Sequence, residues 1–117
     1  ITFLGVTFKP NTDDMREASS IPMIKYLNRK KSKINYYDPS GEKDVFKNFK
    51  NVNYCSTISS ACLKADLVIL HTEWNDFKLL NFKKLIKKQK FKIYDMRNMY
   101  SPLRMKKLKI DYFGVGR

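Results

Sequence analysis

The sequence contains little glycine, proline, cysteine or histidine, and these shortages exclude several classes of protein. Four glycines and four prolines in 117 residues leave no linker or low-complexity tract, so we expect one compact domain over residues 1–117. Two cysteines and one histidine cannot build a zinc site or a secreted disulfide framework. We therefore expect no metal site, and we expect Cys55 and Cys62 to be buried thiols.

Long hydrophobic runs are also missing. No run reaches the roughly 20 apolar residues that cross a bilayer, and no signal peptide stands at the start. These absences predict a cytoplasmic protein without a membrane partner. The first residue, Ile1, already lies in an apolar stretch of strand length, which suggests a fragment of a longer polypeptide.

Acidic residues are scarce: 11 stand against 24 Lys and Arg, for a net charge of +13. A charge of this size is compatible with a basic nucleic-acid-binding module, because lysines that neutralise phosphates release counterions. However, no aromatic residues interleave with the lysines as stacking platforms. The densest cluster instead has the helical spacing of a solvated basic face: Phe82, Lys83, Lys84, Leu85, Ile86, Lys87 and Lys88. We therefore expect no nucleic-acid partner.

Apolar runs of strand length alternate with helical segments along the chain. Ser20, with Pro22 close behind it, marks the start of one helix, and Ser56 or Thr57 marks the start of another. Strands joined through helices imply right-handed crossovers. The predicted fold is α/β, a Rossmann-like doubly wound, mostly parallel sheet with helices on both faces and about six strands: 1–6, 33–37, 52–54, 66–71, 92–94 and 112–115.

Charged residues follow the predicted strands, at the edge where open parallel sheets bind ligands. They are Lys9, Asp13, Asp14, Arg16, Asp38, Glu73, Asp95 and Arg97. Gly5 has no glycines at GxGxxG spacing after it, so a backbone cradle for a pyrophosphate is not expected. Side chains are the alternative: Lys9 as a point charge and Arg97 as a planar fork can bind phosphate, and Phe8 offers an apolar face to a base or sugar.

Each of these residues also has a purely structural interpretation. Asp13, Asp14 and Arg16 can pair with one another to fold an irregular loop, and spacing leaves both interpretations open. A local ion pair between Asp95 and Arg97 would close the loop after the fifth strand.

Two further residues after the fourth strand favour structural roles. Trp74 is expected to anchor the core at the strand end. His71 has no serine, cysteine or carboxylate at a spacing that defines a triad, so we expect a satisfied or exposed histidine.

Five segments, in order over nearly the whole chain, carry a family resemblance: GVTFKPNTDDMREASS, YYDP, ADLVILHTEWNDF, YDMRNMY and YFGVGR. Together they resemble the UDP-binding domain of the UDP-glucose/GDP-mannose dehydrogenase family. The segments TEWNDF and FKPNTDDMREA look most like the UDP-glucose branch. Members that act on UDP-N-acetylmannosamine or GDP-mannose share much of the second segment and remain alternatives.

The resemblance implies a reaction that this chain cannot complete alone. Family members oxidise a sugar C6 alcohol in two NAD-dependent steps, which implies conversion of UDP-glucose to UDP-glucuronate on a catalytic cysteine. That cysteine lies in a Gly-rich motif that is absent here, and neither Cys55 nor Cys62 matches it. No catalytic residue is therefore assigned. NAD is expected to be bound mainly by an N-terminal domain outside these residues, and the full-length enzyme is expected to be a homo-oligomer.

The resemblance also implies roles for four residues by motif position. Phe8 and Lys9 resemble substrate contacts, and Arg97 resembles a substrate-side arginine. Arg16 resembles an arginine that reaches NAD across the domain cleft. His71 departs from the apolar or small residue that the family more often has before TEW.

Overall fold

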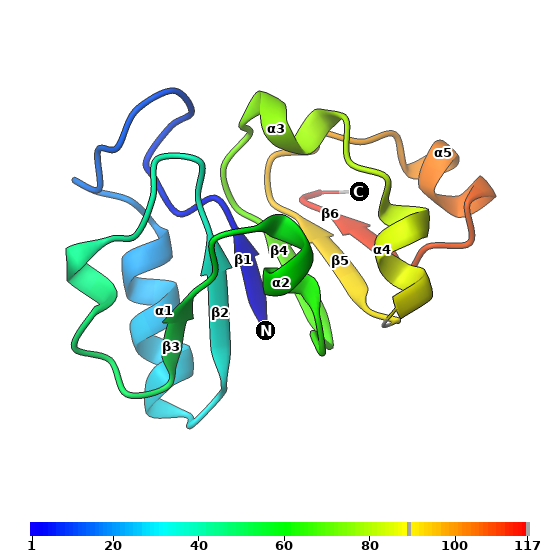
Figure 1. The fold of residues 1–117 in the computed structure, drawn as a ribbon. Helices are drawn as coiled ribbons and strands as arrows, with labels where there is room; N and C mark the ends of the chain where they lie inside the picture. Colours follow the sequence, from blue (N-terminus) through cyan, green and yellow to red (C-terminus); the bar gives the residue numbers. More distant parts are fainter. Residues whose placement is uncertain (89, 117) are drawn as a thin grey trace.

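The computed structural model describes residues 1–88 and 90–116, with the side chains of residues 87 and 88 excepted. Within this part of the chain, six strands form one sheet in the order β3-β2-β1-β4-β5-β6, and every neighbouring pair is parallel (Figure 1). The strands are β1 (Thr2–Leu4), β2 (Ile34–Tyr37), β3 (Val52–Tyr54), β4 (Leu67–Leu70), β5 (Lys92–Asp95) and β6 (Tyr112–Gly114). The six predicted strands are confirmed, in a sheet that is parallel throughout.

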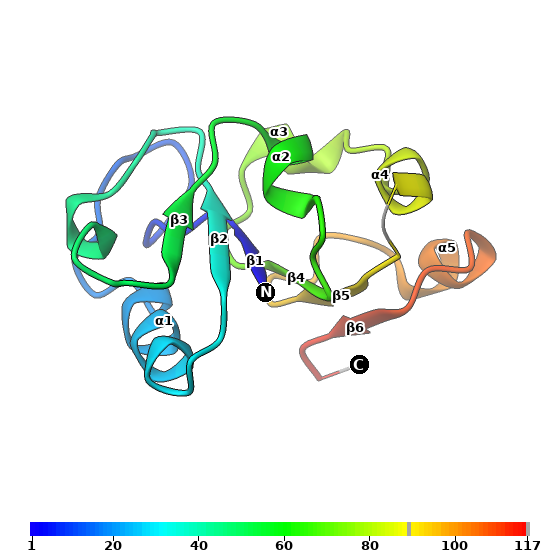
Figure 2. The ribbon, with the colours of Figure 1, turned by 60° about the horizontal axis from the view of Figure 1, so that its bottom comes forward.

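Helices cover both faces of the sheet, as predicted. They are α1 (Ser20–Arg29), the 3-10 helix η1 (Asp44–Phe46), α2 (Ile58–Cys62), α3 (Asn75–Lys78), α4 (Phe82–Lys88) and α5 (Pro102–Lys107). Figure 2 shows α1 on one side of the sheet and α2, α3 and α4 on the other. Neighbouring residues of β1 point to opposite faces: Phe3 packs in one core cluster with Ile24 of α1, and Leu4 packs in the other with Phe77 and Met105.

The two predicted helix starts differ in their chemistry. Thr57 caps α2, because its hydroxyl accepts a hydrogen bond from the Ser60 amide at 3.0 Å. Ser20 is the first residue of α1, but its hydroxyl makes no cap and donates instead to the Val6 carbonyl at 2.6 Å. This bond ties the start of α1 to the end of β1.

Helix α4 exposes a basic face, as the lysine spacing predicted. Lys83 and Lys84 are exposed and Phe82 is buried. The side chains of Lys87 and Lys88, which belong to the same prediction, lie outside the described residues. In the described ranges, no helix combines the length and the apolar character needed to cross a membrane.

The sheet order reverses between β1 and β4, and the two strands end in close contact there. Gly5 follows β1 with a φ of +78°, a conformation that residues with a Cβ rarely adopt. A Cβ at Gly5 would lie 2.7 Å from the Cβ of Thr72. Glycine is therefore required for the two chain segments to approach at this reversal, which is where doubly wound sheets bind ligands.

We predict that Gly5→Ala destabilises the fold more than Gly41→Ala does. The left-handed backbone costs a residue with a Cβ about 1–2 kcal/mol, and the contact with Thr72 adds about 1–3 kcal/mol of overpacking. Gly41 has a φ of +97° but no atom within 4 Å of an added Cβ, so it carries the backbone cost alone. Urea unfolding of both variants measures the difference, and equal losses would contradict the close contact.

Candidate functional site

The loop between β1 and α1, residues 5–19, carries three of the four predicted ligand contacts. Residues just after β4 hold its beginning: the Thr72 hydroxyl donates to the Thr7 carbonyl at 2.8 Å, and the Trp74 indole donates to the Thr7 hydroxyl at 3.2 Å. Trp74 is buried, so its predicted role as a core anchor is confirmed. The same Thr7 hydroxyl donates to the Lys9 carbonyl at 3.0 Å, so it links the indole to the backbone of Lys9.

His71 holds the other end of the loop. Its imidazole is fully buried, with Nε2 2.8 Å from the Ser19 hydroxyl and Nδ1 2.9 Å from the Thr72 hydroxyl. Because the Thr72 hydroxyl donates its one proton to Thr7, it must accept from Nδ1. This assigns the proton to Nδ1 and leaves Nε2 to accept from Ser19. The histidine is satisfied, as predicted, by a serine 52 residues away.

Burial keeps the imidazole neutral. Desolvation, followed by the nearby positive charge of Arg97, lowers the pKa of His71 from 6.5 to about 4. At neutral pH the ring therefore acts as one fixed donor and one fixed acceptor.

Arg97 is oriented by His71 and Glu73. Its Nε donates to the His71 carbonyl at 2.8 Å and lies 3.6 Å from a carboxylate oxygen of Glu73. Its two terminal nitrogens donate no hydrogen bond to any of the described residues, so both are available to a ligand. The alternative ion pair with Asp95 is wrong, because Asp95 accepts from the Arg97 backbone amide at 3.0 Å instead.

Two acidic residues predicted for this edge have structural roles. Asp38 is buried and accepts hydrogen bonds from the amides of Val6 and Ser40, at 2.8 and 2.9 Å. Asp95 is also buried and accepts from the Tyr112 hydroxyl at 2.7 Å. These carboxylates shape the ends of the strands and are not exposed to a ligand.

Arg16 pairs with Asp14 at the exposed side of the loop. Its Nε and Nη2 donate to the two carboxylate oxygens at 3.1 and 3.0 Å, and this pairing lowers the pKa of Asp14. The Asp14 carbonyl accepts from the Phe8 amide at 3.0 Å, which closes the loop. The structural interpretation thus holds for Asp14 and Arg16, whereas Asp13 forms no ion pair with any described residue. The Arg16 side chain is still 89% exposed.

Phe8 and Lys9 lie open to solvent. Phe8 is 46% exposed. The Lys9 ammonium donates to no atom in the described part of the chain. The loops that follow β1, β4 and β5 run along one edge of the sheet (Figure 1), so the structure brings Phe8, Lys9, Arg16 and Arg97 to a common edge.

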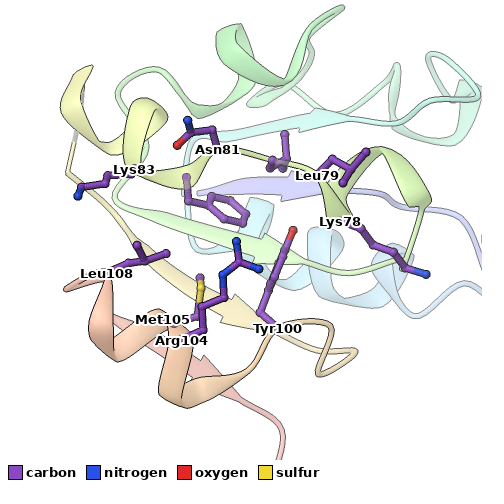
Figure 3. Close-up of a pocket in the computed structure, with 10 residues that line it drawn as sticks. Lys78, Leu79, Asn81, Lys83, Tyr100, Arg104, Met105 and Leu108 are labelled. Carbon is purple, nitrogen blue, oxygen red and sulfur yellow. The ribbon is translucent and has the colours of Figure 1, made fainter.

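A cavity of about 330 Å³ lies away from these four residues. It opens between the α3–α4 turn and α5, where Tyr100, Met105 and Arg104 line it (Figure 3). None of the predicted ligand contacts contributes to its wall. The candidate site is therefore an open edge distinct from this cavity.

The cysteines are unsuited to nucleophilic chemistry. Both are free; Cys62 is buried, and Cys55 is half-buried, so the predicted burial holds fully only for Cys62. Burial raises the pKa of both thiols, that of Cys62 to about 12, which leaves them protonated at neutral pH. In the part of the chain that the structure describes, no group of three or more His, Cys, Asp or Glu could hold a metal ion.

A parallel sheet in this order, with helices on both faces, defines a Rossmann-like doubly wound α/β domain. Comparison with known families narrows this class. Residues 2–102 match the model of the UDP-glucose/GDP-mannose dehydrogenase family, UDP binding domain. The chain belongs to this family.

Its relatives agree with the family match. A UDP-glucose 6-dehydrogenase of Rickettsia felis is 36% identical over 99% of this chain, and one of Bacillus subtilis is 37% identical over 100%. The chain spans 27% of the length of each.

Solved structures resemble the fold. A UDP-N-acetyl-mannosamine dehydrogenase from Staphylococcus aureus superposes with a TM-score of 0.73 at 25% identity, over 99% of this chain and 26% of that one. A UDP-glucose dehydrogenase from Pyrobaculum islandicum gives 0.73 at 23% identity, over 97% and 24%.

The turn after β1 does not fit the pyrophosphate of a dinucleotide. Such a turn needs several glycines so that backbone amides can approach the phosphates. Here the single glycine, Gly5, has its free side filled by Thr72, and a long loop with side chains follows. The backbone amides of this turn are therefore not placed to cradle a dinucleotide pyrophosphate.

We predict that His71 makes the fold sensitive to acid. Its pKa is about 4 in the folded state and about 6.5 when unfolded, so the unfolded state binds more protons between these values. The unfolding free energy should fall as the pH drops from 6.5 to 4, by up to about 3 kcal/mol from this group.

The variant His71→Gln isolates that contribution, because its amide does not titrate and all carboxylates are shared with the parent. Chemical unfolding at pH 7 and pH 4 measures both proteins. The parent should lose more stability than the variant, and parallel losses would contradict the depressed pKa.

Proposed function

We propose that residues 1–117 are the UDP-binding domain of a UDP-glucose 6-dehydrogenase, whose intact polypeptide oxidises UDP-glucose to UDP-glucuronate with two NAD. The observation that carries the proposal is identity of 36–37% to enzymes of that name over the whole of this chain. Because the chain spans 27% of those enzymes, the oxidation itself requires residues outside it. The isolated domain is expected to bind UDP weakly and to reduce no NAD.

The nucleotide is held by side chains in this proposal. Lys9 places a mobile ammonium near the diphosphate, and Arg97 offers its two terminal nitrogens as a planar fork. Because Nε of Arg97 is already bonded to His71, less rotational freedom is lost when the fork binds. The exposed ring of Phe8 packs against the base or the sugar.

Arg16 is the proposed contact to NAD, which the resemblance places mainly on an N-terminal domain. Its pair with Asp14 orients the guanidinium, and its exposed side chain can reach a neighbouring surface. NAD supplies the hydride acceptor, whereas this domain binds and orients the sugar nucleotide and helps to exclude water from the closed cleft. Neither cysteine of this chain takes part.

A different sugar nucleotide is the alternative. The TM-score is 0.73 for both the UDP-glucose and the UDP-N-acetyl-mannosamine enzyme, so the fold does not discriminate between these substrates. The relatives at 36–37% identity are named UDP-glucose 6-dehydrogenases, and this favours UDP-glucose. Assays of the intact enzyme with UDP-glucose, UDP-N-acetylmannosamine and GDP-mannose decide between them.

We predict that Lys9→Met and Arg97→Gln each weaken UDP binding by about tenfold, because each removes a charge-assisted contact to phosphate. NMR titration of the domain with UDP measures the affinity. Lys83→Met is the matched control, since Lys83 is an exposed lysine on α4. Shifts confined to residues far from Phe8, Lys9 and Arg97, or equal weakening in the control, would count against the site.

We predict that Lys9 and Arg16 affect the use of different substrates in the intact enzyme. Lys9→Ala should raise the KM for UDP-glucose and leave that for NAD unchanged, whereas Arg16→Ala should raise the KM for NAD alone. Arg29→Ala, an exposed arginine in the last turn of α1, controls for the loss of charge. Steady-state kinetics supply the constants, and unchanged values in both test variants would refute the assignment.

A further inference from the structure

We propose that His71 is a positioning residue for the whole ligand edge: its imidazole closes the neck of the 5–19 loop, and its carbonyl oxygen orients Arg97. The identity of the ligand in this proposal rests on the proposed function. The positioning role of His71 rests on the geometry. It explains why a polar residue occupies a fully buried position at the end of β4.

The neck of the loop is the place where its two ends, at Thr7 and Ser19, come together, and the imidazole of His71 connects them. Ser19 bonds to Nε2 directly, and Thr7 is reached through the Thr72 hydroxyl. Fixing both ends of a loop reduces the conformations open to the residues between them. The side chains that gain this order are those of Phe8, Lys9 and Arg16.

Helix α1 has anchors other than the imidazole. The Ser20 hydroxyl bonds to the Val6 carbonyl at 2.6 Å, and Ile24 packs in the core. Loss of the ring should therefore loosen the loop and leave the helix in place. This separates a positioning role from a general contribution to folding.

The same residue acts on Arg97 through its backbone. The His71 carbonyl receives Nε of Arg97 at 2.8 Å. The bonds of the imidazole to Ser19 and Thr72 add to the bond between the His71 amide and the Leu4 carbonyl in fixing this segment. Movement of this segment would turn the guanidinium plane. His71 thereby couples the loop with Lys9 and Arg16 to the arginine on the neighbouring strand end.

An imidazole suits this position because it supplies a donor and an acceptor on a rigid ring. An asparagine amide reaches the place of Nδ1 and can donate to Thr72. A glutamine amide reaches the place of Nε2 and can accept from Ser19. The variants His71→Asn and His71→Gln thus each keep one bond, and His71→Ala keeps neither.

Steady-state kinetics of the intact enzyme test the coupling. His71→Ala should raise the KM for UDP-glucose and the KM for NAD together, each by about tenfold, with a smaller effect on kcat. His71→Asn and His71→Gln should each recover part of the loss. Met105→Ala, a buried residue packed on the opposite face of the sheet from α1, provides a control of reduced stability.

Hydrogen exchange of the same proteins supplies a readout without ligand. The Phe8 amide, bonded to Asp14, should exchange about tenfold faster in His71→Ala, while the Gly5 amide, bonded to Tyr37, keeps its rate. If the parent enzyme does not oxidise UDP-glucose, the proposed function is wrong. The exchange result still tests the positioning role of His71 in that case. Unchanged Phe8 exchange, or equal KM changes in Met105→Ala, would overturn the positioning role.

Discussion

The meeting of β1 and β4 at their carboxyl ends is the constraint on which the rest of the structure depends. The two strands pair in register to Leu4 and Leu70, and the His71 amide donates to the Leu4 carbonyl at 3.0 Å. Beyond this bond the two segments stay close together, and only a glycine at position 5 lets Thr72 approach. The hydroxyl of Thr72 then fixes the start of the loop. A larger residue at position 5 would displace the whole series of contacts that ends at Ser19.

This meeting point is polar and buried, a combination that is stable only when every group has a partner. Thr7, His71 and Thr72 are each fully buried and each hydrogen-bonded. The low pKa of His71 follows first from the same burial, which removes water from around the charged form of the ring. Burial therefore accounts both for the rigid hydrogen bonding at this edge and for the neutral state of the imidazole.

Local patterns predicted the fold well because short apolar runs between helical segments leave few topologies open. They also placed Phe8, Lys9, Arg16 and Arg97 after strands that meet at one edge. Spacing could not reveal the bond between Ser19 and His71, whose partners lie 52 residues apart. Knowledge that β1 lies between β2 and β4 in the sheet would have indicated this bond. That strand order places the residues after β4 beside the loop after β1.

The exposed position of the cations limits what this domain can do alone. An ion pair at about 4 Å contributes about 1 kcal/mol in bulk water, but several times more where the surroundings are partly desolvated. Lys9, Arg16 and Arg97 all face solvent, so a diphosphate bound here stays hydrated on one side. A second surface that closes over the edge would strengthen every one of these contacts without changing a residue. In the proposed function the domain orients a nucleotide, and tight binding would depend on what covers this edge.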